Sequence, residues 1–576
     1  MLFNLLQKAV LTSGILPVEE INAPEELFAP YQIGGFFLIG ILNACLMILI
    51  AFKFFQAIQQ CGYKGGDYFK WLKKKDNVYF TRILTLSMLS LLGFILVNMA
   101  LSFINHPFIK YTGFFVYFIF LFVYFSTDIK ELRKKSKVPF KFTKKALRLI
   151  ISFGVLTVLL SVILILGINL LAIPFKENLL ANFRYGVLCL CPIAVPYVVL
   201  LANAVNKPIE KLINKKYYDG LKVALSKRPD LIKIGITGSY AKTTVKNVLT
   251  AMLSEKYSVL ASPKSFNTPM GMVKTAKLLK DNHQVLICEM GARKSGDIKE
   301  LSALINPNIA VITGVNHQHL ESFVTIENII RTKSEILKGD FKGKAFISSD
   351  SKYALEIYEK ASCEKYLAGL DNSNGALVYA KNVSVSENGT EFTLVYNGEE
   401  QKIKTKLLGE HNVSNIALAA SVALSLGVTL KQIGLAVEKL EQVEHRLQLI
   451  KAENGVKVLD DGYNSNPDGI RYALKVLSSF SGKKYVVTPG IIELGILGFR
   501  FNYEAGRIIA DVCDGVILIG RDGSLQIREG LLSKGYPTDK IVMVKDLNEA
   551  KEKLKDILVS GDTVLFANDV MDIHIN

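Results

Sequence analysis

The chain has 576 residues, a formal net charge of +17 and a hydrophobic content of 50%. Its length predicts about three or four domains. The seven cysteines include no CxxC pair, which argues against a structural zinc site and a disulfide framework. The positive charge does not indicate nucleic-acid binding, because the second half has no basic stripe with interleaved aromatic residues.

The first 205 residues contain five apolar runs that are long enough, or nearly long enough, to cross a bilayer as helices. The runs lie near 34–52, 82–103, 111–126, 148–173 and 184–205, and the third is short. A buried core helix explains any single run but not five in succession. The sequence therefore predicts an α-helical transmembrane region of about five helices within residues 1–210.

Basic residues crowd into alternate segments between these runs. Segments 53–82, 127–148 and 206–233 hold seven, nine and eight Lys/Arg residues, whereas 1–33 holds only Lys8. Such residues accumulate on the cytoplasmic side of a membrane. The N-terminus is therefore predicted outside, and the chain after residue 205 is predicted in the cytoplasm.

After residue 230 the pattern changes to that of an α/β protein. Short runs rich in β-branched residues alternate with amphipathic helical stretches. The runs are LIKIGIT, QVLICEM, NIAVITG, GVKVLDD, KKYVVTPG, GVILIG and DTVLFAN. Because ligands bind at the carboxyl ends of strands in open α/β sheets, the polar residues that follow these runs are the candidates for a site.

The stretch Gly235–Asn247, GITGSYAKTTVKN, predicts a strand, a tight loop and a helix. The backbone N–H groups of such a loop and of the helix N-terminus cradle phosphate. The candidate nucleotide-binding residues are Gly238, Ser239, Ala241, Lys242, Thr243 and Thr244. Lys242 would reach the terminal phosphates, and the Thr243 hydroxyl would face Mg²⁺. Ala241 stands where glycine is usual, and a Cβ at positive φ costs about 1–2 kcal/mol.

Further candidates follow the next strands. Glu289 closes an apolar run, where a carboxylate is well placed for a metal, although a solvated loop acid is the alternative. His317 and His319 follow another run, and histidines at this spacing can bind a metal although most do not. Lys333, fourteen residues past His319, is by default a solvated helix lysine.

Two more groups of polar residues lie further along the chain. Asn412 and Asn415 stand at the start of an Ala-rich helix, where simple N-capping is the alternative. Arg446 and Asp461 are fifteen residues apart, and Asp461 ends a strand that runs into a turn-rich loop.

Taken together and in order, these motifs resemble the Mur ligase superfamily of ATP-dependent amide-forming ligases. The ordered set is TGSYAKTT, SFNTPMG, CEMGA, NHQHLESF…RTKSEI, GEHNVSN, HRLQ and DDGYNSNP. The resemblance runs from about residue 211 to the C-terminus, and it is closest to the MurF-type enzymes that add D-alanyl-D-alanine to the UDP-MurNAc-tripeptide. It implies a P-loop central domain over 211–445 and a Rossmann-like C-terminal domain over 446–576.

The resemblance also implies roles for the matching residues. Lys242 and its loop would bind the phosphates of ATP, and Arg446 would approach the γ-phosphate. Thr243 and Glu289 would hold one Mg²⁺. His319 would hold a second together with Lys333, which in the family reacts with CO₂ to form a carbamate. Asn415 would contact adenine, Asn412 would structure the same turn, Asp461 would contact the ribose, and residues 265–271 would border the acceptor substrate.

The chain departs from the family in that five predicted spans replace the UDP-sugar-binding domain. The function expected is a membrane-anchored ATP-dependent carboxylate–amine ligase of the bacterial cytoplasmic membrane, with its ligase domains on the cytoplasmic side. Its partners would be a peptidoglycan precursor peptide, an amino acid or dipeptide, the bilayer and other envelope-synthesis enzymes. The alternative is an inactive nucleotide-binding membrane scaffold, which Ala241 suggests. A transporter ATPase is disfavoured because no signature loop of that class is present.

Overall fold

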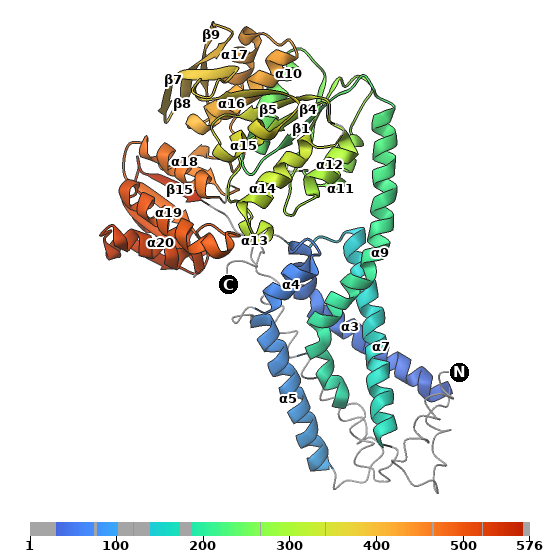
Figure 1. The fold of residues 1–576 in the computed structure, drawn as a ribbon. Helices are drawn as coiled ribbons and strands as arrows, with labels where there is room; N and C mark the ends of the chain where they lie inside the picture. The colour runs from blue at the N-terminus through green and yellow to red at the C-terminus, as the bar shows by residue number, and fades with distance from the viewer. Residues whose placement is uncertain are drawn as a thin grey trace. The chain divides into compact units, whose positions relative to one another are not determined.

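The chain divides into two compact units in the computed structural model (Figure 1). One unit extends to Leu212 and the other begins at Ile213, so the division falls within helix α9 (Cys191–Ser226). The structure describes residues 30–73, 78–101, 119, 122, 139–172, 186–264, 266–339, 341–463, 466–520 and 522–567.

The first unit is helical in the part of the chain that the structure describes. Its elements are α3 (Pro30–Gln60), α4 (Gly65–Leu72), α5 (Val78–Leu101), α7 (Lys144–Ala172), the 3₁₀ turn η2 (Gly186–Leu190) and most of α9. Within those residues, four helices are long and apolar enough to cross a membrane: Phe36–Gln60, Phe80–Val97, Lys144–Gly167 and Leu188–Ser226. They coincide with four of the five predicted runs. The run 111–126 lies outside the described residues except for 119 and 122.

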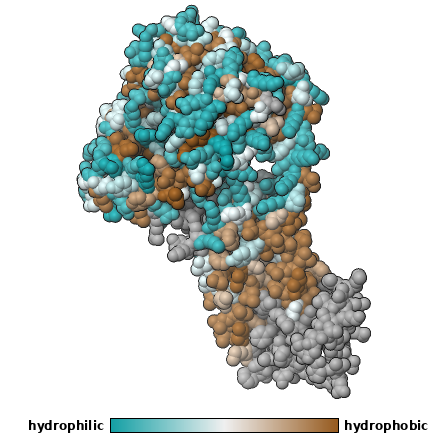
Figure 2. Space-filling view, viewed as in Figure 1, coloured by the Kyte–Doolittle hydropathy of each residue, from teal (hydrophilic) through white to brown (hydrophobic). Residues whose placement is uncertain are grey.

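These helices are apolar on two sides. On their inner faces α3 packs against α7, where the rings of Phe55 and Phe153 meet edge to face at 5.2 Å. Their outer faces carry exposed large side chains such as Leu38, Met88 and Ile163. Figure 2 shows this apolar surface in brown over the first unit. A soluble protein rarely exposes so large an apolar area, and a lipid environment would cover it.

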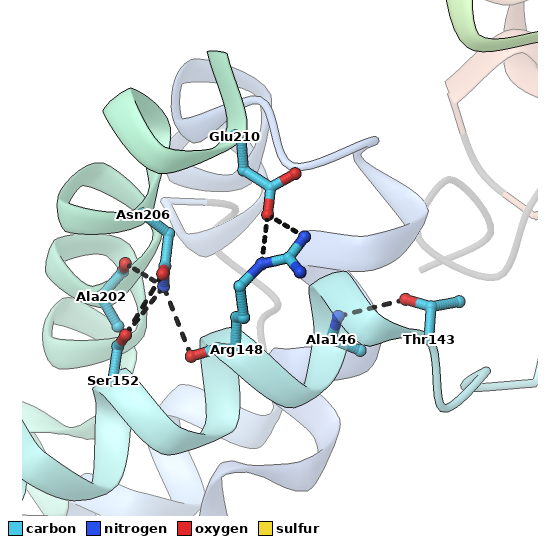
Figure 3. Close-up of polar contacts among 7 residues, drawn as sticks. All are labelled: Thr143, Ala146, Arg148, Ser152, Ala202, Asn206 and Glu210. Carbon is cyan, nitrogen blue, oxygen red and sulfur yellow. Dashed lines mark hydrogen bonds and ion pairs between the residues drawn. The ribbon is translucent and has the colours of Figure 1, made fainter. Parts of the chain in front are cut away.

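Polar side chains join α7 to α9 (Figure 3). Arg148 donates from Nε and Nη2 to Glu210 Oε1 at 2.8 and 2.5 Å. One turn later in α7 and one turn earlier in α9, the Asn206 amide donates to Ser152 Oγ at 3.0 Å and to the Ala202 carbonyl at 2.9 Å. Pairing of this kind is what allows charged and amide groups to lie at the end of an apolar helix pair.

The second unit contains a nine-stranded sheet in the order β2-β3-β1-β4-β5-β6-β7-β8-β9. The strands are β1 (Ile232–Thr237), β2 (Val259–Ala261), β3 (Val285–Glu289), β4 (Ile309–Ile312), β5 (Lys344–Ser348), β6 (Glu364–Gly369), β7 (Val378–Ser386), β8 (Gly389–Tyr396) and β9 (Glu399–Thr405). β1 to β7 pair in parallel, and β7, β8 and β9 form an antiparallel meander. The sheet is therefore mixed.

Helices bury both faces of this sheet. One face packs against α10 (Lys242–Ser254), α16 (Glu410–Ser425) and α17 (Leu430–Glu438). The other packs against α11 (Pro269–Ala276), α12 (Asp297–Ile305), α14 (Ile326–Lys333) and α15 (Lys352–Lys360). Alternate residues of each strand point to opposite faces, so strands covered on both sides read as continuous apolar runs.

A second sheet of six strands follows in the order β10-β11-β15-β12-β13-β14. Its strands are β10 (Gln448–Lys451), β11 (Lys457–Asp461), β12 (Lys484–Thr488), β13 (Gly515–Ile519), β14 (Ile541–Val544) and β15 (Thr563–Ala567). One face packs against α18 (Pro467–Ser478), α19 (Gly498–Val512) and α20 (Asp522–Ser533), and the other against α21 (Leu547–Ile557). All seven runs predicted as strands are strands, and the predicted α/β class is confirmed.

Candidate active site

The candidate site begins at the centre of the nine-stranded sheet. β1 lies between β3 and β4. The loop after β1 is the predicted phosphate loop, Glu289 ends β3, and His319 follows β4. Strand order changes direction at β1, and such a point is where an open α/β sheet forms its ligand crevice.

The phosphate loop has the predicted strand–loop–helix form. Ala241 is the N-cap residue of α10, with φ of 64°, so the position does require the left-handed conformation inferred from the usual glycine. Gly238 has φ of 151°, and a Cβ on it would lie 1.9 Å from Thr313 Oγ1. The Lys242 ammonium donates to the carbonyls of Gly238 and Ser239 at 2.7 and 2.8 Å. The loop is therefore compact and holds its lysine close to the phosphate position.

Thr243 and Glu289 meet as a metal site requires. The Thr243 hydroxyl donates to Glu289 Oε2 at 2.9 Å, and Glu289 is only 2% exposed. Oxygen donors of this kind suit Mg²⁺. Two further residues hold the carboxylate. Lys246, which no sequence motif pointed to, lies with its Nζ 3.2 Å from Oε2, and Asn267, from the stretch expected to border the acceptor, donates to Oε1 at 3.2 Å. Ser265, at the start of the stretch expected to border the acceptor, lies outside the described residues.

Lys333 is buried, with 3% of its side chain exposed. The default interpretation of a solvated helix lysine is therefore wrong. Burial lowers its pKa well below the usual range, and the positive charge of Lys242 adds to this effect. A neutral amine is the form that can react with CO₂, so the environment of Lys333 suits a carbamate.

His319 is the partner expected for Lys333. Burial lowers the pKa of His319, and the charges of Arg293 and Lys333 lower it further, whereas Glu493 opposes them. A shift in this direction favours the neutral imidazole, which is the form that binds a metal. No cluster of three or more His, Cys, Asp or Glu side chains is present among the described residues. If Lys333 is a carbamate, its oxygens and the His319 imidazole would be candidate ligands for a second Mg²⁺.

His317, two residues earlier, packs between rings. Its ring centroid lies 5.6 Å from that of Tyr353 and 5.2 Å from that of Phe501. This contact supports the packing interpretation of His317 and leaves His319 as the metal-ligand candidate of the pair.

Arg446 is an electrostatic neighbour of Lys242, and Asp461 is an electrostatic neighbour of Arg446. Burial lowers the pKa of Lys242 to about 8, with Glu289 opposing and Arg446 adding to the shift. Burial likewise lowers the pKa of Arg446, whereas the negative charges of Asp461 and Glu289 raise it. Asp461 is 2% exposed and accepts a hydrogen bond from the Leu447 N–H at 3.0 Å. Arg446 thus shares one electrostatic environment with Lys242 and Glu289, although it stands more than 150 positions after them in the chain.

The candidate adenine residues lie in the first two turns of α16. Its N-cap is Gly409, without a side-chain capping bond, so the N-capping alternative for Asn412 is wrong. Asn412 donates instead to the Leu408 carbonyl at 2.8 Å, and Asn415 donates to Asn412 at 3.4 Å. The ring of His411 stacks on Tyr472 of α18 at 5.0 Å.

Asn316 links the two sheets, a role that its place in the sequence did not predict. Its backbone N–H donates to the Ser239 hydroxyl at 3.1 Å. Its amide donates to Asn466 Oδ1 at 2.8 Å and to Asp468 Oδ2 at 2.9 Å. The phosphate loop is thereby connected to the turn-rich loop after Asp461, so the second sheet takes part in forming the site.

Comparison with known families agrees with this geometry. The model of the Mur ligase middle domain matches residues 236–423, and that of the Mur ligase glutamate ligase domain matches residues 445–568. The UDP-N-acetylmuramoyl-tripeptide–D-alanyl-D-alanine ligase of Bacillus subtilis (strain 168) is 31% identical over 336 residues, which are 58% of this chain and 72% of that protein. The chain belongs to the Mur ligase family. It is a MurF-type Mur ligase, and therefore an ATP-dependent ligase.

Other relatives point the same way. The ligase of the same name from Haemophilus influenzae is 31% identical, over 54% of this chain and 68% of that protein. MurF from Acinetobacter baumannii superposes with a TM-score of 0.57 at 26% identity, over 63% of this chain and 79% of that chain. The MurF ligase of Thermotoga maritima in complex with ADP has a TM-score of 0.54 at 27% identity, over 62% of this chain and 82% of that chain. The described helices before Leu212 lie outside both matched domains.

Proposed function

We propose that this Mur ligase is anchored in a membrane and joins the carboxylate of a peptidoglycan precursor peptide to the amine of a second substrate, with D-alanyl-D-alanine the leading candidate. The observation that carries the site assignment is the shared environment of Lys242, Glu289 and Arg446 at the carboxyl ends of β1 and β3. The relatives named for D-alanyl-D-alanine addition support the choice of substrate.

The assigned chemistry proceeds through an acyl phosphate. The substrate carboxylate attacks the γ-phosphoryl group of ATP, ADP leaves, and the incoming amine then displaces phosphate to form the amide. Charge spread over the transferred group requires cations rather than a covalent protein partner. Lys242 and Arg446 supply two of them. Bound Mg²⁺ would neutralise more of this charge.

The residue roles follow the contacts. Gly238, Ser239, Ala241 and Thr244 would form the phosphate cradle with Lys242. Thr243 and Glu289 would hold one Mg²⁺, and His319 and carbamylated Lys333 a second. Asn412 and Asn415 would shape the adenine pocket, Asp461 would bind the ribose, and Arg446 would approach the γ-phosphate.

The proposed domains are a transmembrane region over 1–210, a central ATP-binding domain over 211–445 and a C-terminal domain over 446–576. The division after Leu212 and the gap between the two matched families, from 423 to 445, support these boundaries. The four apolar helices support membrane anchoring. The alternation of basic segments supports a cytoplasmic position for the ligase domains.

The test is ADP release by the purified full-length protein. ATP and Mg²⁺ are supplied with a UDP-linked or lipid-linked tripeptide precursor, and the amine is D-Ala-D-Ala, a single amino acid or none. We expect release that requires both a precursor and D-Ala-D-Ala. The matched control is Lys242→Met, which should abolish release. Equal release with no amine, or with single amino acids alone, would contradict the assigned substrate.

A further inference from the structure

Glu493 reaches from the C-terminal domain to the candidate metal ligand of the central domain. It lies between β12 and the 3₁₀ turn η4 (Gly495–Leu497). Its carboxylate makes a hydrogen bond with His319 Nδ1. Its carbonyl accepts from the Glu321 N–H at 3.0 Å, so the contact is made by backbone as well as side chain. Arg293 adds a longer charged contact at 3.9 Å.

Both ends of this contact have unusual backbone conformations. His319 and Glu493 each have φ of 60°, although neither is glycine. A side chain at positive φ costs on the order of 1–2 kcal/mol per residue. Such strain persists only where surrounding structure holds it, and it gathers at functional sites. Two strained residues that meet across two domains therefore point to a contact with a role beyond packing.

The chemistry of imidazole gives that role. A neutral histidine carries one N–H, and the group that accepts this N–H decides which nitrogen keeps a free lone pair. Metal-binding histidines commonly donate their second ring N–H to a carboxylate, which fixes the tautomer and the ring orientation. Here the accepting carboxylate is Glu493 and the donating atom is Nδ1, which leaves Nε2 for a metal.

We propose that Glu493 is a positioning residue that holds His319 in the Nδ1–H tautomer for the second metal, so that the second metal site is complete only when the C-terminal domain is docked. The proposal rests on the two-metal site of the proposed function. His319 and Lys333 belong to the matched middle domain and Glu493 to the matched C-terminal domain. Docking and second-metal binding must then favour each other to the same extent.

Two other roles for Glu493 predict different results. As a direct metal ligand, it would bind the ion independently of His319. As a purely structural partner of Arg293, it would affect folding but not the metal. A measurement that counts metals and reads their nitrogen ligands separates these roles from positioning.

The experiment uses the full-length protein in detergent with a non-hydrolysable ATP analogue and Mn²⁺ as the probe. Electron paramagnetic resonance titration gives the number and affinity of bound ions, and electron spin-echo modulation detects an imidazole nitrogen on Mn²⁺. The variants are Glu493→Ala, Glu493→Gln, His319→Ala and the double variant. Alanine keeps the Cβ, so the backbone strain at residue 493 does not change. The control is Glu504→Ala, at a half-exposed glutamate of α19 whose ion pair with Arg500 runs along the same helix.

We expect two Mn²⁺ ions in the wild type, one with an imidazole signal. Glu493→Ala should lower the affinity for the second ion about 10–100-fold, which is the range for loss of a group that holds a metal ligand in place. It should also reduce the imidazole signal. Glu493→Gln should lose less affinity for the second ion, because its amide oxygen still accepts from Nδ1–H. Binding of the first ion should not change in any Glu493 variant, and Glu504→Ala should bind both ions as the wild type does. The double variant should bind the second ion no more weakly than His319→Ala alone.

Three results would overturn the proposal. Binding of the second ion within twofold of wild type in Glu493→Ala would show that the contact does not position His319. Additive losses in the double variant would make Glu493 a ligand in its own right. A single Mn²⁺ in the wild type would remove the two-metal site itself and with it that part of the proposed function, whereas the first two results would leave the proposed function intact. If Glu493→Ala fails to fold, Glu493→Met, which keeps a side chain of similar length but has no oxygen to accept from Nδ1–H, carries the same comparison.

Discussion

Replacement of Lys333 tests whether a buried lysine serves the metal site. Lys333 is 3% exposed, and burial together with Lys242 depresses its pKa. A surface lysine changed to alanine alters stability by no more than about 0.5 kcal/mol. If Lys333 carries a carbamate that binds a metal, Lys333→Ala instead removes an anion from the reacting centre. Metal stabilisation of the transferred charge is worth several kcal/mol.

The magnitude follows from that figure. A loss of about 4 kcal/mol in transition-state stabilisation lowers turnover about 10³-fold. ATP should still bind within a few-fold of wild type, because Lys242, Thr243 and Glu289 remain in contact with one another and with their loop. Turnover is measured as ADP release with both substrates, and ATP affinity by calorimetry.

Matched variants separate the charge from the cavity. Deleting a buried stem of this size costs about 2–5 kcal/mol of stability through cavity formation. Lys333→Met keeps the stem, so it should be more stable than Lys333→Ala and equally inactive. Lys333→Arg should have turnover as low as that of Lys333→Ala, since its permanently charged guanidinium cannot take up CO₂. Lys338→Ala, at an exposed lysine just past the 3₁₀ turn η3 (Ser334–Leu337), is the neutral control.

Chemical rescue completes the test. Acetate or formate at high concentration should restore part of the turnover of Lys333→Ala by supplying a carboxylate to the vacated space. The same anions should not rescue Lys242→Met, whose role is cationic. Wild-type turnover in Lys333→Ala would refute the carbamate assignment and leave a one-metal mechanism.

Three further predictions follow. Ala241→Gly should bind ATP as well as or better than wild type, because glycine removes the Cβ strain at φ of 64°, about 1–2 kcal/mol; a tenfold loss of affinity in calorimetry would mean that the Ala241 methyl group makes a needed contact. Lys242 has a pKa of about 8 in the free protein, and bound phosphate should raise it, so ATP binding should take up about half a proton at pH 8 and about a tenth at pH 7; titration heats that do not depend on the buffer at pH 8 would contradict this. A cysteine at position 20 should react with an impermeant reagent in intact cells and one at Lys141 should not, since basic segments lie inside; the opposite pattern would reverse the topology.

Much of the candidate site was predictable because its residues follow strands. Lys242, Glu289 and Asp461 each stand at or just beyond the end of a run that the structure forms as a parallel strand. The strand signal is strong there because both faces of the sheet are covered, so the runs are continuously apolar. The meander β7–β9 gave no comparable signal, because its strands mix buried and exposed positions.

Lys246 is a residue of the candidate site that the sequence pattern did not identify. It stands one turn after Lys242 in α10, and its sequence position is that of an ordinary helix lysine. In the structure it is 2% exposed and lies 3.2 Å from Glu289. The signal that could have found it is the i, i+4 spacing from Lys242, which places both lysines on one helix face.

The apolar helices, the parallel strands and the residue types at their ends follow from local sequence, because each depends on neighbours within one element. Which of those ends meet depends on how the elements pack in the folded chain. His319 and Glu493 are 174 residues apart, and Asn316 and Asn466 are 150 apart. No local periodicity encodes such pairs, since they form only where parts of the two sheet domains meet. The burial that lowers the pKa values of Lys333 and Lys242 has the same origin, because a lysine loses its water only when other elements close around it.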